Sequence, residues 1–221
     1  MEDTLRTDWD VIVVGGALSG SATTCLMLRR NPKLRVLILE RTDQLKRRVG
    51  ESTVEISAYF LGRVLGLTDH LLEHHLPKQG MRFWFSNRSA KALNECSETG
   101  PRYNVRLPGY QVDRAVLDEH VLANAVKEGA ALRRLVRVRK VALVPGGAQT
   151  VEWDDEHGVL QKTTARWVVD ASGVATLLGR QEGWLRPNPA HPTATCWGRW
   201  SGVTSLDDRS LFEKYPAWSN R

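Results

Sequence analysis

The stretch DVIVVGGALSGSATTCLMLRR, residues 10–30, carries the pattern that decides the fold. It opens with an apolar run over residues 10–14, typical of a strand that is buried on both faces. A glycine-rich turn follows, and the residues after it predict a helix from about Gly20 to Arg30. An Asn-Pro pair ends this helix before a second apolar run, RVLILE. The order predicts a strand–helix–strand unit whose two strands are parallel.

The turn after the first strand has the pattern of a dinucleotide site. Gly15 permits the tight turn, Gly20 permits close packing of helix on strand, and the helix N-terminus offers N–H groups to a pyrophosphate. Glu40 ends the second strand, where a carboxylate can accept hydrogen bonds from ribose hydroxyls. The alternative is a glycine-rich turn without a ligand, which Glu40 disfavours. The predicted cofactor contacts in this unit are Gly15, Gly16, Ala17 (in place of the middle glycine of G-x-G-x-x-G), Ser19, Gly20 and Glu40.

Three later blocks follow in a characteristic order. A basic loop, RTDQLKRRVGES (residues 41–52), precedes a helix that we predict over residues 53–67. The block GYQVDRAVLDEHVLANA (residues 109–125) contains Asp113, which is suited to cap a helix with an amphipathic face. The block ARWVVDASGVATLLGR (residues 165–180) predicts a buried strand, a turn and a helix. This series resembles the FAD-dependent oxidoreductases that include flavin-dependent halogenases, geranylgeranyl reductases and aromatic hydroxylases.

The resemblance implies FAD rather than NAD as the cofactor. In that family the basic loop runs beside the flavin, and the third block lies against the dinucleotide. The arginine at the position of Arg114 reaches toward the flavin in relatives. Arg114 also lies in the first turn of its helix, a poor place for a cation, which favours a ligand role over a surface role. The resemblance adds these predicted cofactor contacts: Arg41, Arg48, Gly50, Glu51, Ser52, Arg114, Asp170, Ala171 and Gly173.

Lys78 is the predicted catalytic residue. In the stretch HLPKQGMRFWF (residues 75–85), Met81, Phe83 and Phe85 alternate with other residues and predict a half-buried strand with Lys78 at its mouth. The spacing from Lys78 to Phe83 resembles that of flavin-dependent halogenases. The resemblance implies that reduced FAD, oxygen and halide give hypohalous acid, which the lysine directs at an aromatic substrate. The alternative is an ordinary solvated lysine at a strand end.

These patterns predict an FAD-dependent, halogenase-like oxidoreductase that halogenates a small aromatic molecule. Its implied partner is a flavin reductase that supplies reduced FAD, and its implied co-substrate is a halide. A first alternative is a monooxygenase or a geranylgeranyl-reductase-like enzyme on the same scaffold. A second, of another class, is a non-catalytic nucleotide-binding subunit. Replacement of Lys78 separates the halogenase from a hydroxylase, because only the halogenase depends on that side chain.

The predicted fold class is α/β. We expect a Rossmann-like FAD-binding domain over residues 1–190, with an antiparallel meander over about 131–163 inserted in its parallel sheet. TATCWGRWSGV (residues 193–203) alternates and predicts the first strand of a substrate-binding sheet, in a truncated second domain over 191–221. The sequence lacks the Gly-Asp motif with which relatives complete the flavin site. We therefore expect an N-terminal portion of a longer flavoprotein that binds FAD poorly alone.

Composition excludes several other classes. The net charge of +6 is spread along the chain without a recognisable nucleic-acid module, so no nucleic-acid partner is predicted. Three cysteines without a C-x-x-C pair favour free thiols in a reducing cytoplasm. No signal peptide or membrane-spanning apolar window is present, which predicts no membrane partner. HLLEH (residues 70–74) matches the zinc string H-x-x-E-H but lacks a third ligand, so we predict a connecting helix and no metal.

Overall fold

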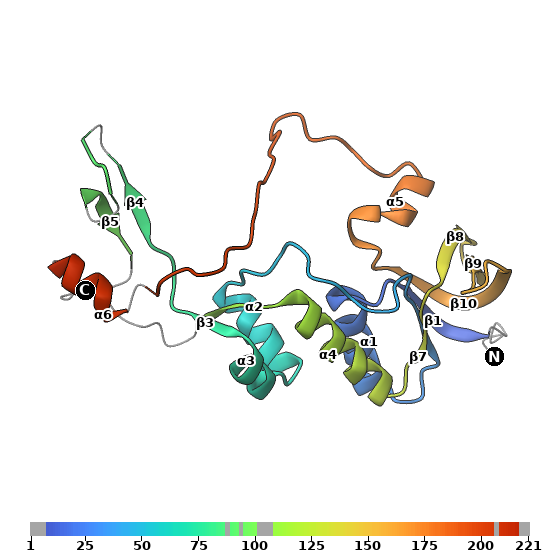
Figure 1. The fold of residues 1–221 in the computed structure, drawn as a ribbon. Helices are drawn as coiled ribbons and strands as arrows, with labels where there is room; N and C mark the ends of the chain where they lie inside the picture. Colours follow the sequence, from blue (N-terminus) through green and yellow to red (C-terminus); the bar gives the residue numbers. More distant parts are fainter. Residues whose placement is uncertain (1–7, 87–88, 93–94, 101–107, 206–207, 217–221) are drawn as a thin grey trace. The chain divides into compact units, whose positions relative to one another are not determined.

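The computed structural model describes residues 8–86, 89–92, 95–100, 108–205 and 208–216, and Figure 1 shows its ribbon. The chain divides into two compact units. The first combines Met1–Glu51 with Val112–His191, and the second combines Ser52–Gln111 with Pro192–Arg221. The predicted boundary between residues 190 and 191 remains a prediction.

A mixed sheet forms the centre of the first unit. Among the described residues it has six strands in the order β7-β2-β1-β10-β9-β8. Neighbouring strands from β7 to β10 are parallel. β9 pairs antiparallel with the first half of β10 on one side and with the edge strand β8 on the other. The predicted α/β fold, a parallel sheet with an antiparallel meander, is confirmed. The strands are β1 (Trp9–Val14), β2 (Val36–Leu39), β7 (Ala131–Arg133), β8 (Arg137–Ala142), β9 (Gln149–Asp154) and β10 (Leu160–Asp170).

Helix α1 (Leu18–Arg30) packs on this sheet, and helix α4 (Arg114–Lys127) packs on α1. α1 joins β1 to β2 and contacts both strands. The contact between the helices includes the buried Cys25 thiol, which lies 3.8 Å from the Val121 carbonyl oxygen. Asp113 caps α4 by accepting a hydrogen bond of 3.0 Å from the Ala115 N–H, as predicted.

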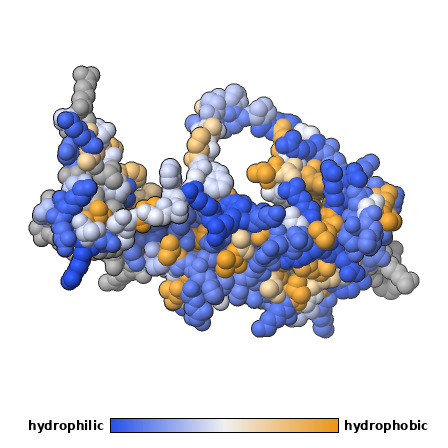
Figure 2. All heavy atoms as spheres, in the orientation of Figure 1, coloured by the Kyte–Doolittle hydropathy of each residue, from blue (hydrophilic) through white to orange (hydrophobic). Residues whose placement is uncertain are grey.

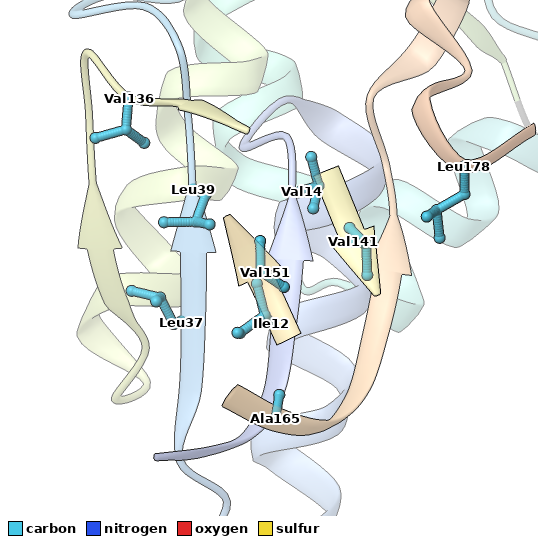
Figure 3. Packing of buried hydrophobic residues seen from close by; sticks show 9 residues of the cluster. All are labelled: Ile12, Val14, Leu37, Leu39, Val136, Val141, Val151, Ala165 and Leu178. Carbon is cyan, nitrogen blue, oxygen red and sulfur yellow. The ribbon is translucent and has the colours of Figure 1, made fainter. Parts of the chain in front are cut away.

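A cluster of aliphatic side chains joins the parallel strands to the meander (Figure 3). The apolar run of β1 is buried on both faces, as its lack of alternation predicts. One face of the strand contributes Ile12 and Val14 to this cluster. Burial of each such side chain contributes about 1.5–3 kcal/mol, so the cluster stabilises the turn that follows β1. Its members are Ile12, Val14, Leu37, Leu39, Val136, Val141, Val151, Ala165 and Leu178.

The meander differs from the prediction at both of its ends. Residues 131–133 pair parallel with β2 and so belong to the parallel part of the sheet. At the other end β10 begins at Leu160 rather than at residue 165. This strand pairs antiparallel with β9 over its first half and parallel with β1 over its second half. A single long strand can serve two partners in this way, and local sequence patterns do not reveal the change of partner.

The remaining elements are short. The first unit also contains η3 (Gly173–Ala175), a 3₁₀ turn, and α5 (Leu177–Gln181). The second unit contains two small antiparallel ladders, β3 with β6 and β4 with β5. Its described elements are α2 (Glu55–Tyr59), the π-helical turn η1 (Phe60–Val64), α3 (Thr68–His74), β3 (Leu76–Lys78), β4 (Phe83–Phe85), β5 (Ser97–Thr99), β6 (Gly109–Gln111) and α6 (Arg209–Lys214).

Two predictions in the second unit were wrong in detail. The helix expected over 53–67 divides into α2 and the π turn η1, where the Leu65 N–H bonds to the Phe60 carbonyl oxygen at 2.9 Å. The strand expected at 81–85 forms only over β4, and the buried face is reversed. Phe83 and Phe85 are exposed, whereas Trp84 between them is half-buried. A ladder of two three-residue strands is too small to bury either of its faces fully.

No strand forms over residues 193–203, although the alternation there predicted one. A strand needs a neighbour to satisfy its backbone groups, and the described residues give this segment no ladder. Trp197 and Trp200 are exposed in consequence. On the face shown in Figure 2, hydrophilic residues predominate and apolar ones are scattered among them.

Candidate functional site

The turn after β1 has the backbone geometry that the glycine pattern predicts. Gly15 has φ +104°, and a Cβ built on it would lie 2.4 Å from the Ala171 carbonyl oxygen. A Cβ on Gly20 would lie 2.0 Å from the Gly15 carbonyl oxygen and 3.0 Å from a methyl group of Val13. Any side chain at either position would therefore push β1, α1 and the strand-to-helix turn at residue 171 apart. The two glycines are required by the packing itself.

The N-terminus of α1 is suited to an anion. Ala17 is the N-cap residue, and no side chain caps the helix there. The first turn contains no acidic residue, and Ser19 within it is exposed. Uncapped N–H groups and the positive end of the helix dipole favour a negatively charged group at such a position. This 13-residue helix therefore fits the pyrophosphate of a dinucleotide.

Glu40 is buried next to this turn and already holds part of it. One of its carboxylate oxygens accepts the Gly16 N–H at 2.8 Å. The other accepts the backbone N–H of Thr42 at 3.0 Å and its hydroxyl at 2.8 Å. Because a carboxylate offers about four acceptor positions, capacity for one ribose hydroxyl remains. The predicted contact between Glu40 and ribose stays a prediction, and the structure adds a role in fixing the turn.

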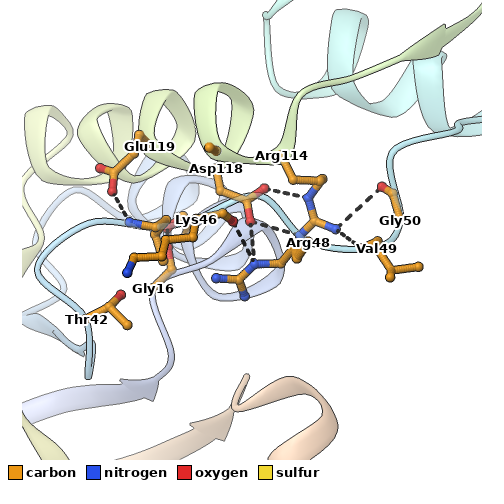
Figure 4. Close-up of polar contacts among 12 residues, drawn as sticks. Gly16, Thr42, Lys46, Arg48, Val49, Gly50, Arg114, Asp118 and Glu119 are labelled. Atoms are coloured by element: carbon orange, nitrogen blue, oxygen red, sulfur yellow. Dashed lines mark hydrogen bonds and ion pairs between the residues drawn. The ribbon is translucent and has the colours of Figure 1, made fainter. Parts of the chain in front are cut away.

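Asp118 links the basic loop to α4 (Figure 4). This fully buried carboxylate accepts two hydrogen bonds from Arg114, at 2.7 and 2.9 Å, and pairs with Arg48 at 3.8 Å. Arg114 also donates to the carbonyl oxygens of Val49 at 3.2 Å and Gly50 at 3.5 Å. The ion pair explains why Arg114 is stable in the first turn of α4, since its partner Asp118 lies one helical turn further along the same helix.

Three further contacts hold the same loop. Arg47 donates to the Asp113 carboxylate at 2.7 Å, and the Leu45 N–H donates to Glu119 at 2.6 Å. Val112 donates its N–H to the Glu51 carbonyl oxygen at 2.7 Å, which fixes the end of the loop in this unit. Arg41 at the start of the loop is exposed. The cofactor contacts predicted for Arg41, Arg48, Gly50, Glu51 and Arg114 stay predictions.

The turn after β10 closes against the glycine turn. Asp170 accepts the Ser172 N–H at 3.0 Å and the Leu178 N–H at 2.8 Å. The Ser172 hydroxyl accepts the Leu177 N–H at 3.0 Å. These bonds cap the start of α5 and hold the Ala171 carbonyl against Gly15. Asp170 and Ala171 thus shape the turn at the predicted dinucleotide site. Gly173 begins η3 with φ +64°, and direct contact of all three residues with a cofactor remains a prediction.

In the second unit, Lys78 is paired with the last residue of the Gly-Glu-Ser sequence. Lys78 ends β3, is half-buried, and donates a hydrogen bond of 2.8 Å from its Nζ to the Ser52 hydroxyl oxygen. The sequence assigned these two residues to different roles, one to catalysis and one to the cofactor. A basic amine that is held by a hydroxyl is a group that can bind and orient an electronegative small reagent.

The HLLEH segment forms α3, as predicted. The rings of His70 and His74 lie one helical turn apart, with centroids separated by 4.7 Å. The His75 ring also lies 5.1 Å from the His70 ring. No group of three or more His, Cys, Asp or Glu side chains suited to a metal ion occurs within the described part of the chain.

Burial inactivates one nucleophile in the first unit. Desolvation of the Cys25 thiol between α1 and α4 raises its pKa to about 11. A thiol with that pKa remains protonated at neutral pH and is a weak nucleophile. Cys25 therefore belongs to the packing of the helices and not to the chemistry.

Sequence reasoning missed three residues that hold the site. Asp118 was visible only as an acid four residues after Arg114, which is the spacing of a helical ion pair. Gly109 lies inside a strand, where glycine often marks a close approach of another chain segment. Thr53 binds Tyr110 through its hydroxyl, and a lone threonine gives no sequence signal of that kind.

The fold and the glycine turn together are those of an α/β protein that binds a dinucleotide at the carboxyl end of its parallel strands. A family model described as FAD binding domain matches residues 8–198. The chain belongs to this family, and FAD is its cofactor.

Similar proteins include halogenases and a lipid reductase. The flavin-dependent halogenase chlA of Dictyostelium discoideum is 26% identical, and the match covers 96% of this chain and 39% of that protein. Digeranylgeranylglycerophospholipid reductase 2 of Methanopyrus kandleri is 29% identical, over 80% of this chain and 40% of its own length. The solved myxobacterial chondrochloren halogenase CndH superposes with a TM-score of 0.63 at 30% identity, over 75% of this chain and 37% of its own.

The chain thus spans about two fifths of the length of these curated relatives. The relatives are enzymes, in agreement with the predicted oxidoreductase class. Among the described residues, no helix combines the length and apolar character that crossing a bilayer requires.

Proposed function

We propose that this chain is the flavin-binding part of a halogenase-like oxidoreductase, which uses reduced FAD, oxygen and a halide to halogenate a small aromatic molecule. A flavin reductase is the proposed source of reduced FAD. The observation that carries the proposal is the 2.8 Å hydrogen bond between Lys78 and Ser52. It holds an amine beside the Gly-Glu-Ser sequence in a chain whose matched relatives include two halogenases.

In this proposal the first unit binds the dinucleotide. The N–H groups at the start of α1 hold the pyrophosphate, and Gly15 and Gly20 allow the tight turn and the close packing of α1 on β1 that present those groups. The Glu40 carboxylate accepts a ribose hydroxyl through its remaining acceptor position. Arg48 is the loop cation that approaches the flavin in this proposal, because its side chain is 43% exposed and its ion pair with Asp118 is long, at 3.8 Å.

Lys78 is the proposed group that directs the halogen. Reduced FAD, when bound, would give two electrons to oxygen and bring it to the peroxide level, at which it can oxidise halide to hypohalous acid while the second oxygen atom leaves as water. The Lys78 ammonium donates a hydrogen bond to the oxygen of that acid and leaves its halogen end pointing at the substrate. The aromatic ring then forms the carbon–halogen bond and gives up its proton, while the hypohalous oxygen leaves as water.

The test is turnover of the full chain with a flavin reductase, NADH, FAD, bromide and a phenol as the aromatic probe. With methionine present to scavenge free hypobromous acid, we expect brominated phenol from the wild type and a large loss of it in Lys78→Ala, because without the amine the acid escapes into solution before it meets the phenol. Consumption of reduced FAD, followed as oxygen uptake, continues in this variant. Lys33→Ala is the matched control, since Lys33 is an exposed lysine of the first unit.

Two results contradict the proposal. The first is bromination by Lys78→Ala at the wild-type rate, which shows that the amine is not required. The second is the absence of bromide-dependent product from the wild-type chain at FAD concentrations that saturate its flavin site.

A second candidate is reduction of an isoprenoid double bond. It is favoured by the 29% identity with the Methanopyrus kandleri reductase. Such a reaction transfers electrons from reduced FAD to carbon and needs neither halide nor oxygen. Anaerobic incubation with reduced FAD and a geranylgeranyl lipid separates the two candidates, because only a reductase saturates the lipid under those conditions.

A further inference from the structure

Lys78 and Ser52 lie on opposite sides of one strand. Lys78 in β3 pairs with Gly109 of β6, and on the other edge of β6 Ser52 forms an antiparallel bridge with Gln111. Adjacent strands are separated by about 4.8 Å, so β3 and the Ser52 segment lie about 10 Å apart. The hydrogen bond between the two side chains therefore spans the strand between them.

Gly109 makes this crossing possible. A Cβ at this position would lie 3.2 Å from the Lys78 Cε atom and 2.6 Å from the Thr53 carbonyl oxygen. The aliphatic stem of Lys78 thus runs over the one residue of the middle strand that has no side chain. Any larger residue would occupy the path of the lysine and move the Ser52–Thr53 segment away from β6.

Thr53 fixes the position of Ser52, whose hydroxyl oxygen accepts the hydrogen bond from Lys78. Its backbone N–H and its hydroxyl both donate to the Tyr110 carbonyl oxygen, at 2.8 and 2.9 Å. The same hydroxyl oxygen accepts the Tyr110 N–H at 2.7 Å. Three hydrogen bonds between one pair of residues hold the neighbouring Ser52 at a set place along β6. The Ser52 hydroxyl is therefore a fixed acceptor for a flexible lysine.

We propose that Ser52 is a positioning residue for Lys78, and that Gly109 provides the channel over β6 through which the lysine reaches it. Ser52 acts through the lysine. Its hydroxyl oxygen accepts a hydrogen bond from one N–H of the ammonium group, and the other two N–H groups are directed away from β6. The assignment to halogen transfer rests on the function proposed above, whereas the positioning of the amine does not.

The first test measures the amine itself. Wild type, Ser52→Ala and Ser52→Thr are treated with a trace of acetic anhydride at fixed pH, and mass spectrometry gives the acetylation rate of Lys78 relative to Lys33. Loss of the hydroxyl frees the amine, so we expect this ratio to rise about two- to fivefold in Ser52→Ala. Ser52→Thr keeps the hydroxyl and retains the wild-type ratio. An unchanged ratio in Ser52→Ala overturns the proposal.

Gly109→Ala tests the channel independently. The added methyl group displaces the Lys78 stem, so we expect the Lys78 ratio to rise in this variant although Ser52 is intact. A folded Gly109→Ala protein with the wild-type ratio contradicts the channel. If this variant does not fold, the pair Ser52→Ala and Ser52→Thr still decides whether the serine positions the amine.

The second readout separates this proposal from the function on which it rests. In the turnover assay, Ser52→Ala is expected to lower brominated product per reduced FAD consumed, and Ser52→Thr to restore it. A rise in Lys78 acetylation together with bromination that does not depend on Lys78 supports the positioning and contradicts the halogenase function. Unchanged acetylation in Ser52→Ala with Lys78-dependent bromination supports the function and overturns the positioning.

Discussion

The glycine turn of the first unit and the lysine crossing of the second are held in opposite ways. Around Gly15 the backbone segments touch directly, and buried aliphatic side chains fix β1 and β2 beneath them. Around Lys78 the strands are three residues long, and side-chain hydrogen bonds set the positions of the groups. The first arrangement tolerates the loss of single polar contacts but no added methyl group. The second likewise has no room for a methyl group at Gly109, but it depends in addition on the hydroxyl groups of Ser52 and Thr53.

Gly15→Ala is expected to have the largest effect. A methyl group at φ +104° and 2.4 Å from the Ala171 carbonyl oxygen adds backbone strain to a steric clash. Together these destabilise the first unit by about 4 kcal/mol, measured by urea unfolding with far-UV circular dichroism.

Gly158→Ala is the matched control for that change. Gly158 has φ +77° in the turn between β9 and β10, and a Cβ there would meet no atom within 4 Å. Only the backbone strain remains, so we expect a loss of about 1 kcal/mol. Equal losses in the two variants would show that direct packing does not distinguish the glycine turn.

Asp118→Asn tests whether the basic loop is held by burial. The change removes the charge that pairs with Arg114 and leaves that guanidinium, 14% exposed, without its counter-ion. Breaking a buried pair in this way costs about 3 kcal/mol, again measured by urea unfolding.

The comparison for this loop is Arg47→Ala. Arg47 pairs with Asp113 on the surface, where its side chain is 61% exposed, and we expect a loss of less than about 1 kcal/mol. A larger loss from Arg47→Ala than from Asp118→Asn would mean that surface contacts hold the loop.

The pH dependence of stability tests the hydrogen bonds of two carboxylates at the start of β1, and we expect it to be the smallest effect. A hydrogen bond from the Thr164 N–H lowers the pKa of Asp8, and one from the Arg35 N–H lowers the pKa of Asp10, each from the ordinary value of 3.8. A lowered folded-state pKa contributes stability above the unfolded value, and this contribution is lost as pH falls through the folded value. Stability should therefore decline below about pH 4. The double variant Asp8→Asn with Asp10→Asn should show a shallower decline; an identical decline would contradict the assignment.

The sequence was sufficient where local pattern and burial agree. The unbroken apolar run of β1, the glycines of the turn and the Asn-Pro stop each have one physical interpretation, so the strand–helix–strand segment from β1 to β2 could be predicted almost to the residue. The glutamate after β2 could be placed for the same reason.

The rest depends on contacts between residues distant in the sequence. The alternation of residues 193–203 does not indicate whether a neighbouring strand exists, and the strand predicted there was wrong. The double pairing of β10 depends on which strands lie beside it. Lys78 and Ser52 are 26 residues apart, and their contact requires a glycine in a third segment. Three-residue strands carry too little pattern to predict such a ladder.

The most direct test of the central claim is an equilibrium titration of the chain with FAD, followed by flavin fluorescence. An equilibrium titration detects weak binding that desalting would remove. We expect saturable binding that ADP competes for, weakened about tenfold in Glu40→Gln through loss of the charged acceptor for ribose. Glu156→Gln, in an exposed turn, should bind like the wild type. Absence of saturable binding, or equal affinity in Glu40→Gln and wild type, would contradict the assignment of the dinucleotide site to β1, α1 and Glu40.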